Sequence, residues 1–137
     1  MVKYKILIDT NFFFIPFYEN FDVIEELKKF LEIKSIEYEG FYTLRKNIIE
    51  LENKLKTAKS EKWKKIYKLV LEYIKRKNIT VIDTGNNNVR TDRLIVNFVT
   101  LNNNFIVCTQ DRRLRIILKN LNIKVIFYSN KQLHIIG

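Results

Sequence analysis

Three aspartates stand where strand-like segments end or helix-like segments begin, and carboxylates in such places can bind metal ions. Asp9 ends one apolar run of the sequence, Asp111 closely follows another, and Asp92 opens a helix-like segment. In open α/β folds, ligands bind in the crevice outside the carboxyl ends of the strands. Mg²⁺ and Mn²⁺ prefer oxygen ligands and can activate water against a phosphoryl group. We therefore predict that Asp9, Asp92 and Asp111 hold one or two such ions.

Each aspartate also has an ordinary structural interpretation. An Asp at a helix start, as Asp92 and Asp111 are expected to be, often only caps the helix or interacts with its dipole. Asp83 also ends a strand-like run, so the position alone is not specific. The spacing suggests a metal site without establishing one.

Segments with strand and helix periodicity alternate along the chain, which predicts an α/β fold. The predicted strands are 4–9, 33–38, 79–83, 105–109 and 124–128, and Gly40 is expected to break the second. Helices are predicted from Asp22, where the side chain can cap, at 41–56, from a Ser60 cap, at 91–103 and at 111–120. The alternation favours a three-layer α/β/α sandwich around a parallel sheet of about five strands. Residues 10–21 are expected to form a loop, and 129–137 an edge strand or a frayed end.

The composition indicates one globular domain, 1–137, with a polyanionic partner. The chain has 25 Lys+Arg against 15 Asp+Glu, a net charge of +10, which favours nucleic acid or an acidic membrane surface. No apolar run approaches the roughly 18 residues of a membrane span, so a cytoplasmic location is expected. The single cysteine, Cys108, lies in an apolar run and is expected to pack in the core.

Several other chemistries fit this sequence poorly. His134 is the one histidine, so neither a zinc cluster nor a serine triad can be built around it. The sequence lacks a glycine-rich phosphate loop. Phosphatases with an aspartyl nucleophile usually carry a second Asp two positions on, where this chain has Asn11.

Segments near both ends of the chain resemble the PIN-domain family, particularly small archaeal members related to ribosomal-RNA processing nucleases. Residues 6–17 and 22–27 look like the start of these proteins. Residues 105–115 and 123–128 resemble their last acidic motif and final strand, and 91–95 match the third motif. The resemblance implies a PIN-like α/β/α sandwich that cleaves RNA with Mg²⁺ or Mn²⁺.

The same resemblance assigns roles to single residues. It implies that Asp9, Asp92 and Asp111 are catalytic metal ligands. Thr10, Asn11 and Thr109 would orient carboxylates or bound water; the alternative is a set of strand-end hydrogen bonds.

The second motif departs from the family pattern. The family's glutamate is expected near Thr43, which has no carboxylate. Glu50 lies two helical turns further on, about 10 Å along the axis of the predicted helix 41–56. It could replace the missing acid if the helix is displaced, and Glu39 is another candidate. Otherwise Glu50 is an ordinary surface residue.

Basic and aromatic residues complete the candidate RNA-binding surface. Arg112, Arg113, Arg115 and Lys119 crowd one predicted helix and are our candidates for phosphate contacts. Lysines also crowd another helix, at positions 59, 62, 64, 65 and 68. Aromatic side chains can stack on unpaired bases or pack in the core or a homodimer contact; the candidates are Phe13, Phe14, Tyr18 and Tyr42.

Three functions remain open at this point. The first is a metal-dependent endoribonuclease, with ribosomal-RNA processing as its expected setting. The second is a catalytically degenerate PIN domain that binds RNA or protein, which Thr43 in place of glutamate would favour. The third is a VapC-type toxin ribonuclease, which would have an antitoxin partner.

Overall fold

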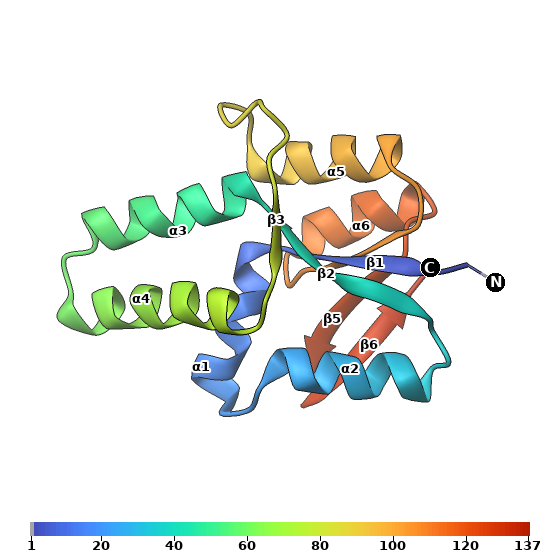
Figure 1. The fold of residues 1–137 in the computed structure, drawn as a ribbon, viewed down its shortest axis with the longest axis horizontal. Helices are drawn as coiled ribbons and strands as arrows, with labels where there is room; N and C mark the ends of the chain where they lie inside the picture. Colours follow the sequence, from blue (N-terminus) through green and yellow to red (C-terminus); the bar gives the residue numbers. More distant parts are fainter. Residues whose placement is uncertain (1) are drawn as a thin grey trace.

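The computed structural model describes residues 2–137 as a six-stranded sheet with helices on both faces (Figure 1). The strand order is β3-β2-β1-β4-β5-β6, and all neighbouring pairs are parallel except β5 and β6. The strands are β1 (Tyr4–Ile8), β2 (Tyr38–Leu44), β3 (Thr80–Ile82), β4 (Phe105–Cys108), β5 (Val125–Ser129) and β6 (Gln132–Ile136). The predicted parallel sheet is confirmed, and the C-terminal segment adds an antiparallel edge strand.

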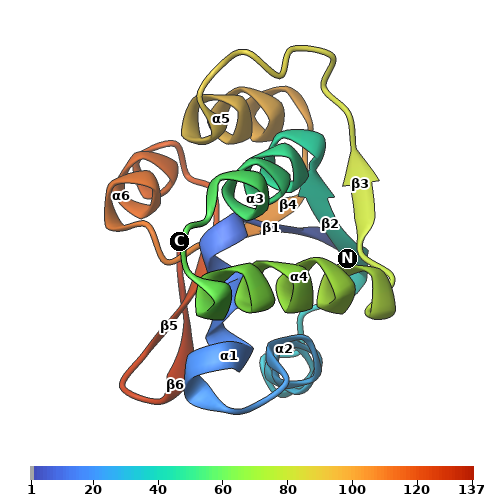
Figure 2. The ribbon, with the colours of Figure 1, turned by 90° about the vertical axis from the view of Figure 1, so that its left-hand side faces the viewer.

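The helices form two layers around this sheet. They are η1 (Thr10–Phe14, a 3-10 helix), α1 (Ile15–Glu19), α2 (Val23–Ile33), α3 (Arg45–Thr57), α4 (Glu61–Arg76), α5 (Thr91–Leu101) and α6 (Arg112–Asn120). Figure 2 shows α1, α2 and α4 on one side of the sheet and α5 and α6 on the other. Helix α3 extends beyond the sheet and pairs with α4 (Figure 1).

Side-chain alternation in the central strand β1 explains why both faces of the sheet are covered. Successive strand residues point to opposite faces. Ile6 and Ile8 are fully buried in the core under α2 and α4, and Leu7 is fully buried in the core under α5 and α6. Both faces of β1 are therefore apolar, as expected of a strand in the middle of a parallel sheet.

Polar side chains fix where three of the helices begin. Asp22 accepts a hydrogen bond from the Glu25 N–H at 3.3 Å, and Ser60 accepts one from the Trp63 N–H at 3.4 Å. Asp111 accepts from the N–H groups of Arg113 and Leu114. These bonds satisfy amides that have no partner within the helix, and the predicted caps at Asp22 and Ser60 are confirmed.

The second strand and the helix after it do not begin where the sequence predicted. Residues 33–38 were expected to form a strand ended by Gly40, but Ile33 ends α2 and Gly40 lies inside β2 with φ of +113°. Helix α3 accordingly begins at Arg45 and not at residue 41. The spacing of Phe41 and Leu44 suits a helix as well as a strand, and pairing of β2 with β1 decides between them.

Residues 10–21 also differ from the expected loop, since they contain η1 and α1. Pro16 lies in the first turn of α1, where its missing N–H leaves no helical hydrogen bond unmade. Within residues 2–137, none of the helices is both long and apolar enough to cross a lipid bilayer.

Candidate active site

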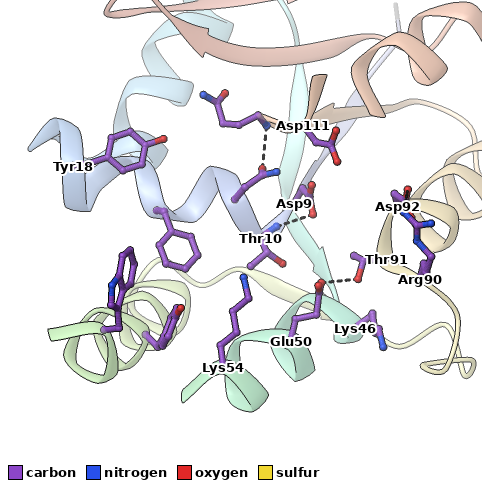
Figure 3. Close-up of a pocket in the computed structure, with 15 residues that line it drawn as sticks. Asp9, Thr10, Tyr18, Lys46, Glu50, Lys54, Arg90, Thr91, Asp92 and Asp111 are labelled. Carbon is purple, nitrogen blue, oxygen red and sulfur yellow. Dashed lines mark hydrogen bonds and ion pairs between the residues drawn. The ribbon is translucent and has the colours of Figure 1, made fainter. Parts of the chain in front are cut away.

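A cavity of about 780 Å³ opens at the carboxyl edge of the parallel strands (Figure 3). Its walls come from η1, α1, α3, α4, the start of α5 and the segment that joins β4 to α6. The chain runs from β1 to β2 on one side, while β4 pairs with β1 on the other. Asp9 thus follows β1, and Gln110 and Asp111 follow β4. These two strands are adjacent at the point where the strand order reverses, which is where open α/β sheets bind ligands.

Four acidic residues, from four different parts of the sequence, line this cavity. They are Asp9, Glu50, Asp92 and Asp111. Thr10 and Asn11 line it as well, and Thr109 lies behind Asp9, fully buried. The structure therefore brings the predicted acids and their predicted neighbours to one place (Figure 3).

Asp9 is the most deeply buried of these acids, with 8% of its surface exposed. Its Oδ1 accepts hydrogen bonds from the Thr10 N–H at 2.8 Å and the Asn47 amide at 3.0 Å, and its Oδ2 accepts one from the Thr109 hydroxyl at 2.8 Å. Burial raises the pKa of Asp9, and the charge of Glu50 raises it further, while the three hydrogen bonds lower it. The carboxylate is fixed in orientation but poorly solvated, so a bound cation would stabilise its ionised form.

Asn47 is a site residue that the sequence did not reveal. Its side chain is fully buried and donates to Thr10 Oγ1 at 2.7 Å as well as to Asp9. Its carbonyl oxygen accepts the Leu44 N–H at 3.1 Å, at the end of β2. Asn47, Glu50 and Lys54 are spaced by three and four residues, so they share one face of α3; that polar spacing was the available signal.

Glu50 lines the cavity for a reason other than the one foreseen. The sequence argument put Thr43 and Glu50 on one helix, but Thr43 belongs to β2, where its hydroxyl donates to the Ile8 carbonyl at 2.7 Å. Glu50 lies in the second turn of α3 and faces the start of α5 (Figure 3). Glu39, the other candidate, pairs with Lys5 at 3.8 Å and does not line the cavity.

Asp111 caps α6, as its ordinary interpretation requires, whereas Asp92 lies in the first turn of α5 and is not its cap. Asp92 Oδ1 accepts the Arg93 N–H at 2.9 Å, and its Oδ2 lies 3.3 Å from the Arg90 guanidinium. Both cap bonds of Asp111 use Oδ1 alone. Both residues nevertheless line the cavity, and Asp111 Oδ2 takes no part in its cap.

One threonine connects the ends of β1 and β4. The Thr109 hydroxyl donates to Asp9 and accepts the Asp111 N–H at 3.1 Å. Asn11 Oδ1 accepts the Gln110 N–H at 3.0 Å and so ties η1 to the same segment. These bonds hold the two aspartate-bearing segments at a fixed separation.

The donor set suits a hard divalent cation, although the acids do not form a closed cage. Among residues 2–137, no three acidic, His or Cys side chains lie close enough together to enclose an ion as they stand. Mg²⁺ usually keeps several waters and uses only one or two carboxylates together with substrate phosphates. Oxygen donors spaced around an open cavity fit that mode of binding.

Three basic residues, which the sequence argument did not select, line the cavity. Lys54 points into it, while Lys46 donates to the Asn87 carbonyl at 2.7 Å (Figure 3). The third is Arg90 beside Asp92.

The four basic residues predicted on α6 all lie outside the cavity lining. Arg112, Arg113 and Lys119 are exposed, and the Arg115 guanidinium lies over the Phe127 ring at 4.1 Å. These residues lie away from the cavity because α6 meets it only at its start, where Asp111 is part of the lining.

The aromatic candidates divide between the cavity and the core. Phe14 and Tyr18 line the cavity, together with Trp63 and Tyr67 of α4. Phe13 is fully buried, so the idea that it stacks on bases is wrong. Tyr42, also outside the cavity lining, packs edge-on against Phe105 at 6.0 Å.

Comparison with known proteins agrees with the architecture. One solved structure, described as "Structure of the PIN domain endonuclease Utp24", superposes with a TM-score of 0.75 over 96% of this chain and 90% of that chain. The two sequences are 20% identical, so the likeness concerns the fold. Curated proteins give no significant match. The family model described as a PIN-like domain matches residues 6–131, and the chain therefore belongs to the PIN-like domain family.

Proposed function

We propose that this protein is a metal-dependent endoribonuclease that cleaves RNA phosphodiesters with activated water. The observation that carries the proposal is the meeting of Asp9, Glu50, Asp92 and Asp111 around one cavity at the switch point of the sheet. Family membership supports nuclease chemistry, and the similar structure is titled an endonuclease. The net charge of +10 suits a polyanionic substrate.

The four acids would hold Mg²⁺ or Mn²⁺ with water completing the coordination. When bound, such an ion polarises a phosphoryl oxygen, lowers the pKa of bound water and stabilises the leaving oxygen. Asn47, Thr10 and Thr109 keep the Asp9 carboxylate in one orientation. Lys54 points into the cavity, where its ammonium can attract a substrate phosphate.

Cleavage of a 5′-labelled single-stranded RNA in Mg²⁺ or Mn²⁺ tests the proposal. Asp9→Asn should abolish cleavage, because it removes ligand charge while the Asn side chain can still accept the Thr10 and Asn47 bonds. Asp83→Asn is the matched control: Asp83 also follows a strand and its carboxylate accepts the Gly85 N–H at 2.8 Å, but it lies outside the cavity lining. Equal cleavage by folded Asp9→Asn and Asp83→Asn proteins would exclude this site as the source of activity.

The two rivals make different predictions. A degenerate, non-cutting PIN domain would bind RNA without cleaving it in any divalent cation. A VapC-type toxin would share the chemistry, and an adjacent antitoxin gene together with a copurifying antitoxin would identify it. Ribosomal-RNA processing, the setting that the sequence resemblance implies, predicts uncut precursor RNA when the active site is mutated in the cell.

A further inference from the structure

Besides the acids, the cavity has an aromatic wall for which the chemistry of cleavage has no use. Phe14, Tyr18, Trp63 and Tyr67 form it, from η1, α1 and the first two turns of α4. The rings of Trp63 and Tyr67 lie 5.8 Å apart and 31° from parallel, and Phe14 meets Tyr67 edge-on at 6.0 Å. These contacts join Phe14, Tyr67 and Trp63 into one aromatic surface that ends at Trp63, and Tyr18 lines the same cavity.

Much of this surface is open to solvent. Trp63 is 46% exposed and Tyr18 is 59% exposed. Helix α4 contributes to the core through Val70, Tyr73 and Ile74, further along the helix. Phe14, Ile66 and Tyr67 also pack against this core, so core packing accounts for much of α4 and part of the wall, whereas the Trp63 side chain at the start of the helix stays exposed.

We propose that this wall is a stacking subsite for one unpaired nucleobase of an RNA strand, with Trp63 as its main contact. The inference rests on the proposed function in taking RNA as the ligand. The same cavity holds the acids, Lys54 and the aromatic wall, so one strand can place a phosphate toward Lys54 and a base on Trp63. Stacking on an aromatic ring needs a base with a free face, so the subsite selects unpaired RNA over duplex.

The surroundings of the wall favour a nucleic acid over an apolar ligand or peptide. Lys54, on the facing helix α3, lines the same cavity as Trp63, and Lys62 and Lys65 add positive charge elsewhere on the surface of α4. Positive charge around an exposed aromatic platform is the combination that binds single strands, because phosphates and bases are contacted together. Without Lys54 or a bound cation, the acids that line the cavity would repel the phosphates of a strand.

The chain has one tryptophan, so fluorescence excited at a wavelength that its tyrosines do not absorb reports on Trp63 alone. The wild-type protein is titrated with a short labelled oligoadenylate in EDTA and low salt, which blocks metal-dependent cleavage. Anisotropy of the label follows binding, while tryptophan emission follows stacking. We expect quenching by oligoadenylate and little quenching by a base-free strand with the same number of phosphates or by duplex RNA. Oligoadenylate that binds without changing the emission would overturn the subsite, and so would a failure to bind at all.

Variants provide a second, independent readout. Trp63→Ala should weaken oligoadenylate binding roughly 5- to 150-fold, the range for one base stacked on an aromatic ring, while Trp63→Phe should keep most of the affinity. The salt dependence of binding should not change, because no phosphate contact is lost. Leu69→Ala is the matched control, since Leu69 is 37% exposed on the same helix but outside the cavity lining.

These measurements separate the subsite from the nuclease proposal. Quenching without cleavage in any metal would retain the subsite and reject the enzyme. Cleavage by a protein whose tryptophan emission does not respond to bound RNA would retain the enzyme and reject the subsite. If Trp63→Ala melts well below the wild type, the fluorescence titration of the wild-type protein still decides the question.

Discussion

The Thr91 hydroxyl donates a hydrogen bond of 2.5 Å to Glu50 Oε1, which joins the second turn of α3 to the first residue of α5. Thr91 precedes Asp92 in the sequence, so this bond sets Glu50 beside one of the predicted ligands. The Thr91 hydroxyl is the donor of this bond, and Glu50 contributes its carboxylate to the cavity.

The first prediction is that Glu50→Gln lowers RNA cleavage by at least tenfold, because it removes one negative charge from the cation-binding cavity. Glu52→Gln should leave cleavage unchanged. Glu52 lies two residues further along the same helix and pairs with Arg45 at 3.7 Å, outside the cavity lining. Initial rates at saturating Mn²⁺ compare the two variants, and equal rates would return Glu50 to the surface role that the sequence left open.

The second prediction concerns the missed residue, Asn47. Asn47→Ala leaves the Leu44 N–H without its acceptor and takes one donor from Asp9, in a fully buried setting. An unsatisfied buried group typically destabilises a protein by about 1–3 kcal/mol, so we expect a loss of that size in urea unfolding. Asn53→Ala, at an exposed position of the same helix, should change stability by less than about 0.5 kcal/mol. Similar losses in both would mean that the Asn47 bonds contribute little.

The acids at strand and helix ends could be found from the sequence because their position follows from local patterns. Apolar runs mark β1 and β4, and parallel strands bring their carboxyl ends to one edge, so the nearness of Asp9 and Asp111 follows from the fold class. Asp92 was found through the resemblance and the start of a periodic helix. None of these inferences required knowledge of which side chains contact one another.

Phe14 and Tyr18 were among the aromatic candidates, but Asn47 and the α4 part of the aromatic wall were not found in this way, because their roles depend on how α3 and α4 pack against η1. The apolar residues in 41–44 are compatible with a helix. The start of α3 was therefore predicted at residue 41 instead of Arg45, and its faces were assigned wrongly. Trp63 fits the apolar periodicity of α4, which does not distinguish it from a core residue. Its exposure depends on where α4 begins relative to the sheet.

The third prediction concerns acid stability and the cap of α2. Burial acts to raise the pKa of Asp22, but hydrogen bonds from Lys77, Tyr73 and the Glu25 N–H hold it below its usual range. A carboxyl whose pKa is lowered by folding stabilises the protein above the unfolded pKa and loses that contribution as pH falls. The stability from Asp22 should therefore be present at pH 7 and decline below about pH 4.

Two substitutions separate the charge of Asp22 from its capping role. Asp22→Asn keeps an N-cap acceptor and should flatten the decline in stability between pH 4 and pH 2. Asp22→Ala removes the cap as well and should lose about 1 kcal/mol more at pH 7. Urea unfolding at several pH values measures both, and an unchanged acid limb in Asp22→Asn would show that other carboxyl groups control acid unfolding.

The last prediction tests the basic face of α6. Arg112 and Arg113 are exposed in the turn that follows Asp111, whereas Arg115 is engaged with Phe127. Each phosphate contact adds roughly 0.7 to the slope of log affinity against log salt for single strands. Replacing Arg112 and Arg113 by Gln should therefore flatten the slope by about 1.4, with similar losses for unrelated RNA sequences, because phosphate contacts do not read bases.

Arg115→Gln is the control and should lower thermal stability with little effect on the slope, since it removes a cation–π contact. An unchanged slope in the double variant would assign both arginines to a solvated helix face and direct the search for the RNA path to the lysines of α4, such as Lys62 and Lys65.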